Sequence, residues 1–381
     1  MDNAHESIDS AMTEDRRPQN RNGEGSFEVE ELYDPADNAS PEEQFVLPGG
    51  PNGADEDRQY GAAAREDAPV QEPANGAAQP QLLQTEPVAR KPHPAAAVQP
   101  DAEIGPTGRP WPKLPEPERP TTHGPAMIVA MCNQKGGVGK TTSTINLGAA
   151  LVETGRKVLL VDFDPQGSLS VGLGVNPHTL ELSIYNLLLG RHILADEVIA
   201  ETDVEGLDIL PSNIDLSAAE VQLVSEVARE QTLLRVLEKV KDRYDVILID
   251  CAPSLGLLTI NALTAADKVI MPLECEFFAL RGIALLNDTI SKVQDRLNPR
   301  LQILGILGTM YDPRTLHSRE VLERVVQAFG ETVFHTVIRR TVKFPETTVA
   351  GEPITTYATT SPGATAYRSL AREVLARCRV E

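Results

Sequence analysis

Apolar runs recur along the chain from residue 127 onward, and each has the length and composition of a buried strand. Stretches with apolar residues three and four positions apart, which are typical of helices, lie between them. We expect strands in the run that begins at Met127 and at 157–162, 207–210, 245–250, 268–273, 302–310 and, less regularly, 332–337. Expected helices are 142–154, 184–189, 195–200, one beginning near 217, 280–297, 319–329 and 363–377. This alternation predicts the α/β class: a doubly wound, mostly parallel sheet with helices on both faces.

The first part of the chain has a different composition. Residues 1–125 hold 19 of the 29 prolines, and their 24 acidic and 10 basic residues account for −14 of the net charge of −20. Such a segment buries too little apolar surface to offset its chain entropy. We therefore expect a disordered, acidic, Pro/Ala-rich tail over 1–122 and one folded domain over 123–381. Trp111, in a polyproline-like stretch, is either a short docking motif or, as composition favours, an incidental aromatic in a linker.

Two classes of protein are not expected. No apolar segment follows Met1, and no apolar run is long enough to span a bilayer, so we expect neither a secreted nor a membrane-spanning protein. The four cysteines have neither metal-ligand spacing nor the arrangement of a disulfide framework, which suits a reducing cytoplasm. We expect Cys132 and Cys251, at the ends of strands, to be small buried residues.

A glycine-rich loop joins the first strand to the first helix. The backbone N–H groups of Gly136, Gly137 and Gly139 can surround a phosphate, Lys140 brings a positive charge to the β- and γ-phosphates, and the Thr141 hydroxyl can bind Mg²⁺. The pattern therefore predicts a phosphate-binding loop.

The amino-acid sequence of this loop departs from the common pattern G-x-x-x-x-G-K-[ST]. Gln134 stands where that pattern has its first glycine, and an additional lysine, Lys135, follows it. Lys135 has no evident role in binding its own nucleotide. It is either a surface charge or a charge that acts on phosphates elsewhere.

Acidic residues follow two of the expected buried strands. Asp162 and Asp164 end one strand and Asp250 ends another. Since parallel strands present functional groups at their carboxyl ends, we expect these acids at the rim that also carries Lys140 and Thr141. Asp250 is the candidate for holding the water shell of the metal. Asp164 precedes a proline, so it also suits the N-cap of a helix.

Four motifs stand in order: Lys-Gly-Gly-Val-Gly-Lys-Thr-Thr (135–142), Asp-Phe-Asp-Pro-Gln-Gly (162–167), Ile-Leu-Ile-Asp-Cys-Ala-Pro-Ser (247–254) and Met-Tyr-Asp-Pro-Arg-Thr (310–315). Together they resemble the deviant-Walker ParA/Soj ATPases, which partition bacterial chromosomes and plasmids. The resemblance implies a P-loop fold and Mg²⁺-dependent hydrolysis of ATP. It covers the chain from about residue 126 to the end.

The resemblance also implies roles for individual residues. Lys135 looks like the lysine that reaches the partner's phosphates in a nucleotide-sandwich dimer, and Asp164 like the acid that orients the attacking water. Asp162 resembles a switch residue near the metal, and Asp250 the Walker B acid. The implied ATP-binding residues are Gln134, Lys135, Gly136, Gly137, Val138, Gly139, Lys140, Thr141 and Thr142.

The partners implied by the resemblance are a second copy of the chain, a ParB-like centromere-binding protein and double-stranded DNA bound without sequence preference. No stable membrane association is implied, and the expected location is the bacterial cytoplasm and nucleoid. The positions that match DNA-binding residues are Arg314 and Lys343, with Arg339 and Arg340 nearby. A solvated basic surface is the competing interpretation of these residues. This stretch departs from the family pattern at 339–348, where the family places a loop beside the base.

Three other functions stay open. A MinD-like regulator at the membrane surface would carry a basic amphipathic extension at its C-terminus; here Tyr367, Leu370, Val374 and Leu375 resemble the core face of a domain helix. ParA-like positioning of a protein cargo is the second. The third, a reductase of the nitrogenase iron-protein kind, would require Cys251 or Cys275 to hold a cluster, and neither lies in a suitable motif.

Overall fold

The computed structural model describes residues 103–190, 192–276 and 279–378. Within them, strands join in one sheet in the order β3-β4-β2-β5-β1-β6-β7. All neighbouring strands are parallel except the edge pair β3 and β4. The strands are β1 (Met127–Met131), β2 (Val158–Phe163), β3 (Ala200–Glu201), β4 (Leu207–Leu210), β5 (Val246–Cys251), β6 (Lys268–Glu274) and β7 (Gln302–Thr309). The central strands β2 and β5 are buried along their whole length, as their continuous apolar sequences predict.

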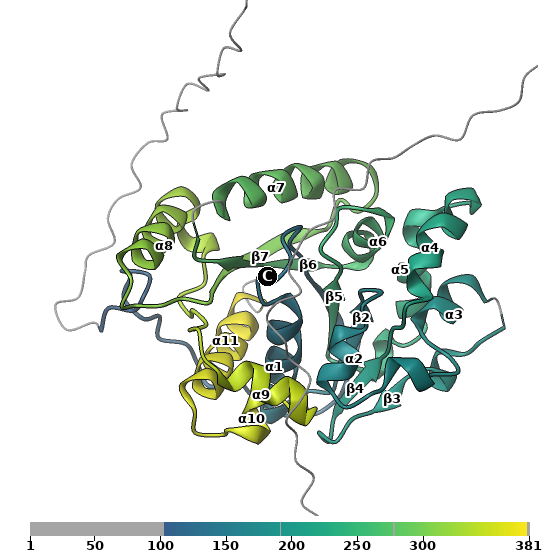
Figure 1. The fold of residues 1–381 in the computed structure, drawn as a ribbon, viewed down its shortest axis with the longest axis horizontal. Coiled ribbons are helices and arrows are strands. Elements are labelled where there is room, and N and C mark those ends of the chain that lie inside the picture. Colours follow the sequence, from purple (N-terminus) through teal and green to yellow (C-terminus); the bar gives the residue numbers. More distant parts are fainter. Residues whose placement is uncertain (1–102, 191, 277–278, 379–381) are drawn as a thin grey trace, which may run out of the picture. The chain divides into compact units, whose positions relative to one another are not determined.

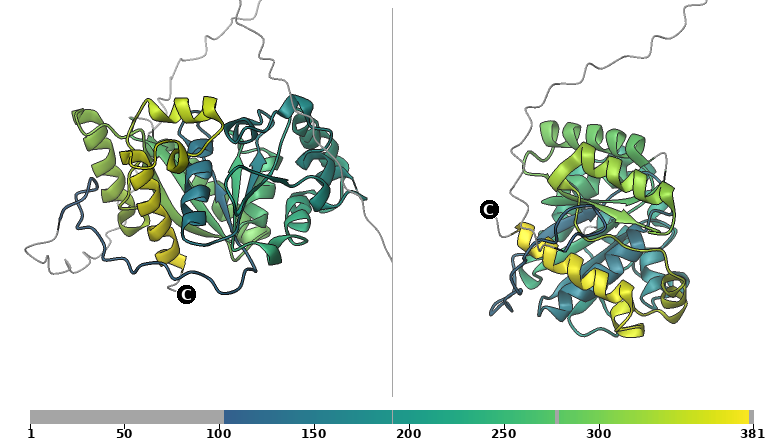
Figure 2. Two further views of the ribbon diagram at one scale, coloured as in Figure 1. Left: turned by 90° about the horizontal axis from the view of Figure 1, so that it is seen from below. Right: turned by 90° about the vertical axis from the view of Figure 1, so that its left-hand side faces the viewer.

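Helices cover both faces of the sheet (Figures 1 and 2). One apolar core lies between the sheet and the helices α1 (Lys140–Glu153), α2 (Ser168–Gly172), α10 (Ile354–Tyr357) and α11 (Pro362–Cys378). The other lies beneath α3 (Ile184–Leu189), α4 (Leu216–Gln222), α5 (Thr232–Leu237), α6 (Leu257–Ala265), α7 (Ala279–Arg296) and α8 (Leu316–Phe329). A further helix, α9 (Lys343–Ala350), precedes α10. The predicted α/β class, with a doubly wound and mostly parallel sheet, is confirmed.

Two predicted elements are wrong. The helix expected at 195–200 is a short 3₁₀ turn, Ala195–Glu197, followed by β3. The strand-like segment 332–337 lies beside β7, where Phe334 N donates to the carbonyl of Ile306 over 2.9 Å. It makes only an isolated bridge to that strand, between Ile306 and Val333. Two of its other N–H groups bond a side chain instead, so no ladder forms.

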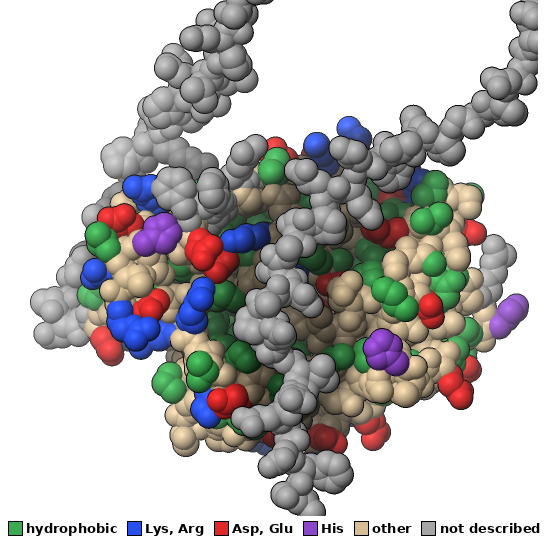
Figure 3. All heavy atoms as spheres, in the orientation of Figure 1, with side chains coloured by type: hydrophobic (Ala, Val, Ile, Leu, Met, Phe, Trp, Pro, Cys, Tyr) green, Lys and Arg blue, Asp and Glu red, His purple; other side chains and the backbone are tan. Residues whose placement is uncertain are grey.

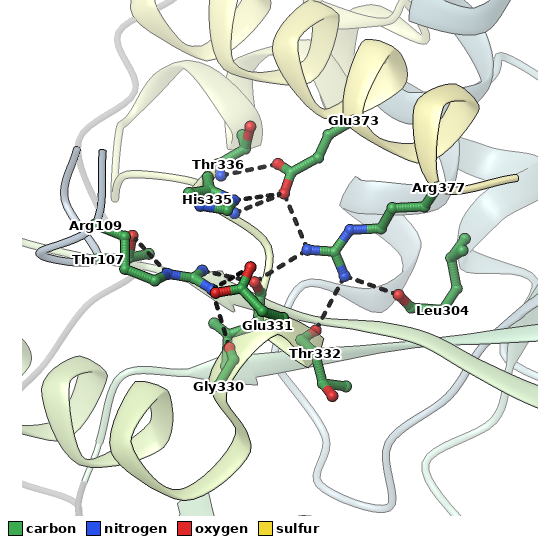
Figure 4. A network of polar contacts seen from close by, with 11 residues as sticks. Thr107, Arg109, Leu304, Gly330, Glu331, Thr332, His335, Thr336, Glu373 and Arg377 are labelled. Atoms are coloured by element: carbon green, nitrogen blue, oxygen red, sulfur yellow. Dashed lines mark hydrogen bonds and ion pairs between the residues drawn. The ribbon is translucent and has the colours of Figure 1, made fainter. Parts of the chain in front are cut away.

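Residues 103–125, which we name the N-terminal strap, lie against the domain. Arg109 donates to the carbonyls of Gly330 and Val333 over 3.0 and 2.6 Å, as Figure 4 shows in part. Further along the strap, His123 Nδ1 lies 2.7 Å from Asp245 Oδ2. These contacts begin before residue 123, where we expect the folded domain to start, and that boundary stays a prediction. Residues 1–102 of the expected disordered tail lie outside the described residues.

Trp111 packs within the strap itself. Its indole covers Gly105 so closely that a Cβ at that position would lie 3.1 Å from Cε2 of the ring. Its backbone N–H donates to the carbonyl of Glu103 over 3.0 Å, and the residue as a whole is 37% exposed. Trp111 thus stabilises a local turn of the strap, a role that neither sequence interpretation included.

Candidate functional site: a phosphate loop and its rim

The loop between β1 and α1 has the backbone of a phosphate cradle. Gly137 and Gly139 have φ of +73° and +81°, in the left-handed region that residues with a Cβ avoid. Gly139 is the N-cap of α1, and no side chain caps this helix. The first N–H groups of α1 therefore face the loop with their positive dipole end, an arrangement suited to a phosphate.

Lys140 and Thr141 extend from the first turn of α1. Lys140 is buried, and its Nζ donates to the carbonyl of Lys135 over 3.1 Å, which closes the loop on itself. The Thr141 hydroxyl donates to Oδ2 of Asp250 over 2.6 Å. The sequence predicted that Asp250 and Thr141 lie at the same rim of the sheet, and the structure places them in direct contact there.

Asp250 and Asp162 occupy paired positions on adjacent strands. Burial, followed by the negative charge of Asp162, raises the pKa of Asp250 to about 8. Burial raises the pKa of Asp162 to about 6, against the lowering effect of hydrogen bonds from Ser170. Two acids beside a threonine hydroxyl form an oxygen-rich, electronegative site, which is the donor chemistry that Mg²⁺ requires.

The two acids of the motif that follows β2 have different surroundings. Asp162 Oδ2 accepts hydrogen bonds from N and Oγ of Ser170, over 2.8 and 2.7 Å, and so holds α2 in place. Asp164 lines the pocket above the loop, and its Oδ1 accepts from Gln166 N over 3.0 Å. The N-cap of α2 is Gly167, so the alternative interpretation of Asp164 as a helix cap is wrong.

Lys135 does not line the pocket of its own loop. Its Nζ lies 2.8 Å from Oε2 of Glu274 and 3.3 Å from Oε2 of Glu276, and the side chain is 47% exposed. The two lysines of the loop therefore occupy different environments. Lys140 is buried at the phosphate cradle, whereas Lys135 is held beside two carboxylates at the end of β6.

The pocket has a volume of about 410 Å³. Beyond the predicted loop residues and Asp164, its lining includes Pro253 and Met310 from two of the quoted motifs, and Thr347 and Thr348 from the stretch 339–348. Residues of the lining that the sequence did not single out are Ile145, Asn146, Ser168, Gly172 and Glu352. Met310, at a φ of +50°, is a non-glycine residue in the left-handed region, which is a mark of a constrained site. A second pocket of about 330 Å³ shares Gly139, Thr142, Met310 and Thr348 with the first.

Two hydrogen bonds hold the elements that line the pocket in place. The Thr309 hydroxyl donates to the carbonyl of Val138 over 2.9 Å, which joins the end of β7 to the loop. Asn146, inside α1, accepts from the backbone N–H of Ile354 over 2.6 Å and so holds α10. The available signal in the sequence was a polar residue, Asn146, between the apolar residues Ile145 and Leu147 of a helix expected to pack on the sheet, because a buried polar side chain needs hydrogen-bond partners.

All four candidate DNA-binding residues follow β7 in the chain: Arg314 precedes α8, whereas Arg339, Arg340 and Lys343 lie before or at the start of α9. Arg339 and Tyr311 form a bridge, and Arg340 N donates to the Tyr311 carbonyl over 3.2 Å. Figure 3 shows basic side chains gathered between α8 and α9. Acids pair with three of the four: Asp312 with Arg314 at 2.8 Å, Glu274 with Arg340 at 3.4 Å and Glu346 with Lys343 at 2.7 Å.

The cysteines and α11 are the features on which two alternative functions depend, the iron-protein-like reductase and the MinD-like regulator. Cys132, Cys251 and Cys275 are buried in the core, as expected for the first two. Tyr367, Leu370, Val374 and Leu375 are likewise buried against the sheet. Among the helices of the described part, none has the length and apolar character needed to cross a membrane.

Comparison with known sequences shows several relatives. A family model described as an AAA domain matches residues 126–303. An uncharacterised protein of Mycobacterium tuberculosis is 62% identical over 289 residues, which are 75% of this chain and 91% of that protein. The chromosome-partitioning ATPase Soj of Treponema pallidum is 52% identical over 64% of this chain and 95% of its own length. The chromosome partitioning protein ParA of Caulobacter vibrioides is 45% identical, over 67% of this chain and 96% of its own length.

Solved structures share the fold. One, a cobyrinic acid a,c-diamide synthase of Mycobacterium smegmatis with bound ADP and magnesium, is 44% identical with a TM-score of 0.60, covering 67% of this chain and 96% of that one. The septum site-determining protein MinD of Pyrococcus horikoshii, complexed with Mg-ADP, is 30% identical with a TM-score of 0.56. The match to MinD covers 65% of this chain and 96% of that one.

Proposed function

We propose that this chain, which belongs to the ParA/Soj family of partitioning ATPases, hydrolyses ATP as a nucleotide-sandwich dimer. The ATP-bound dimer binds double-stranded DNA without sequence preference, and a ParB-like partner stimulates hydrolysis and so releases it. The cycle positions chromosomal or plasmid DNA on the nucleoid.

The placement of Lys135 is the observation that carries this proposal. Its backbone carbonyl is part of the phosphate loop, but its ammonium group lies beside Glu274 and Glu276 and outside the pocket of that loop. A cation is needed where charge develops on the transferred phosphoryl oxygens. A lysine that is fixed to the loop but turned away from its own pocket suits delivery of that charge to a second copy.

The residues present fit ATP with Mg²⁺. The glycine loop and Lys140 bind the phosphates, and Thr141 and Asp250 supply hard oxygen donors at its end. When bound, Mg²⁺ neutralises charge on the phosphate oxygens. ADP and magnesium in the M. smegmatis structure support the same assignment for this chain.

Asp164 is assigned to the orientation of the attacking water. It lines the pocket, is half-buried, and keeps one carboxylate oxygen, Oδ2, that accepts no hydrogen bond from the described residues. Asp162, which is fully buried and bonded to Ser170, is assigned to holding α2, so a change at this acid reaches the pocket wall through Ser168 and Gly172.

Of the basic residues near α8 and α9, Arg314 and Lys343 are assigned to DNA phosphates. Exposed ion pairs of the kind that Arg314 makes with Asp312 contribute little stability, so phosphates compete for these cations at low cost. A net acidic domain does not prevent this, since nonspecific binding requires only a local group of cations. The burial of the apolar residues of α11 speaks against a MinD-like membrane-binding face on that helix.

Retention of the protein on a DNA-coated surface tests this proposal. The full chain, Lys135→Ala, Arg314→Ala and a control, Arg300→Ala on an exposed site after α7, are compared with ATP, with ADP and without nucleotide. We expect ATP-dependent retention of the wild type and the control, and its loss in the other two variants. Retention that is independent of ATP, or equal in all four proteins, would overturn the proposal.

A further inference from the structure

A pair of carboxylates holds Lys135 on its own subunit. Glu274 ends β6 and is only 12% exposed, and its Oε2 lies 2.8 Å from the lysine Nζ. Glu276, two residues later and 51% exposed, reaches the same Nζ at 3.3 Å. We name Glu274 and Glu276 the acidic pair.

The backbone fixes Lys135 relative to the acidic pair. β1 and β6 are neighbours in the sheet, so the chain leaves both at the same edge. Asn133, which is buried, donates from Nδ2 to the carbonyl of Pro272 over 2.7 Å and accepts from Lys135 N over 2.9 Å. The loop carrying the lysine is thereby joined to the strand carrying Glu274. The contact thus follows from the fold and does not depend on chance meeting of two long side chains.

The acidic pair neutralises Lys135. Hydrogen bonding to Glu274 raises the pKa of Lys135, and hydrogen bonding to Lys135 lowers the pKa of Glu276. Lys135 keeps its positive charge, but two carboxylates balance that charge and occupy the N–H donors that a phosphate would use. It must leave at least one of them before it acts on another subunit's nucleotide.

Arg340 gives Glu274 a second cation. Its Nη2 lies 3.4 Å from Oε1 of Glu274, the oxygen that Lys135 does not use. A nearly buried carboxylate left without a partner would be costly, so Arg340 keeps Glu274 paired when the lysine departs. The lysine can therefore leave and return reversibly.

We propose that the acidic pair is a latch that holds Lys135 in the resting monomer and that opens when two ATP-bound copies associate. Glu274 is a positioning residue in this scheme, since it acts through Lys135 and touches no nucleotide. The inference rests on the proposed function, because it requires Lys135 to act on the second copy. Opening two latches in each dimer raises the concentrations of protein and ATP that dimerisation needs.

Dimerisation of Glu274→Gln tests the latch. Sedimentation velocity with a non-hydrolysable ATP analogue gives the dimer Kd, and a separate titration gives the affinity of the monomer for ADP. We expect Glu274→Gln to lower the dimer Kd by about threefold to twentyfold, since exposed pairs contribute modestly and each dimer opens two latches. Glu276→Gln should lower it less, because its contact is longer and more exposed.

Two further proteins make the result decisive. Glu238→Gln removes a carboxylate from another lysine pair, with Lys241 at 4.0 Å, and should leave the dimer Kd unchanged. ADP affinity should be unchanged in all these variants, whereas damage to the loop would lower it. An unchanged or raised dimer Kd in both Glu274→Gln and Glu276→Gln, with normal ADP affinity, would overturn the latch. If Lys135→Ala by itself hydrolyses ATP as fast as the wild type does, the proposed function itself fails.

Discussion

The hydroxyl of Thr141 donates a 2.6 Å hydrogen bond to Asp250, which lies 109 residues further along the chain. One residue belongs to the first turn of α1 and the other to the end of β5. The register between β1 and β5, in which Met131 pairs with Asp250, brings the two elements together. The sheet therefore builds the metal side of the site, and the loop builds the phosphate side.

Removal of the Thr141 hydroxyl should weaken the metal-dependent part of nucleotide binding. We expect Thr141→Ala to lower the affinity for ATP measured with Mg²⁺ by about 10- to 100-fold, because a ligand and its bond to Asp250 are both lost. Thr141→Ser keeps the oxygen and should bind nearly as the wild type does. Isothermal titration with and without Mg²⁺ measures this. Equal affinities for the alanine and serine variants would show that the hydroxyl has no part in the site.

Arg109 should contribute to the stability of the domain through the N-terminal strap. Its guanidinium donates to two backbone carbonyls, those of Gly330 and Val333. We expect Arg109→Ala to lower the free energy of unfolding by about 1–3 kcal/mol, measured by urea denaturation. Arg300→Ala, on an exposed arginine outside the strap, is the control. Identical unfolding midpoints for both variants would mean that the strap adds nothing to the fold.

Glu373 predicts a specific dependence of stability on pH. Burial by itself raises the pKa of its carboxyl, but bonds from His335, from the backbone of Thr336 and from Arg377 outweigh burial and lower it (Figure 4). A lowered pKa in the folded state adds stability above the pKa of the unfolded state, and that stability is lost as pH falls through the folded value.

The variant Glu373→Gln measures this contribution. We expect it to lower the free energy of unfolding by about 1–3 kcal/mol near pH 7, and the difference from the wild type to shrink below about pH 4.5. Urea denaturation across that pH range provides the comparison. A difference that is constant with pH, or that grows in acid, would contradict the role assigned to the carboxylate.

Arg314 should alter the salt dependence of DNA binding. If it contacts one phosphate, Arg314→Ala should reduce the slope of log K against log salt concentration by about 0.9, and by a similar amount for unrelated DNA sequences. Fluorescence anisotropy of ATP-bound protein on two duplexes measures both. An unchanged slope with reduced affinity would indicate that Arg314 acts through the fold and not through a phosphate.

The sequence was sufficient to predict those elements whose structure is determined by a local pattern of residues. Continuous apolar runs predicted the strands β1, β2, β5, β6 and β7, and strand ends placed Asp162 and Asp250 on one edge. The glycines of the loop predicted a backbone that curls around a phosphate, and two of them, Gly137 and Gly139, adopt the left-handed conformation that few other residues adopt.

The sequence was insufficient where distant contacts decide. α9 contains Pro345 and adjacent threonines, and its Val349 is 91% exposed, so it shows no apolar stripe that would mark a helix. The composition of 332–337 favours a strand, but the carboxylate of Glu373, on α11, takes two of its N–H groups. The acidic pair carries no motif of its own, and its role becomes visible only when β6 lies beside β1.

The central claim is that a second copy of the chain completes each ATP site, and mixing two inactive variants tests it directly. Lys135→Ala lacks the cation supplied to its partner, whereas Asp164→Ala lacks the acid of its own pocket. In a mixed dimer, the Lys135→Ala subunit keeps its own Asp164 and receives Lys135 from the other subunit.

The measurement is the steady-state ATPase rate of an equimolar mixture, compared with each variant alone. With random pairing about half of the dimers are mixed, and each mixed dimer has one complete site, so we predict a rate above that of either variant and up to about a quarter of the wild-type rate. A rate no higher than the average of the two separate variants would contradict the claim.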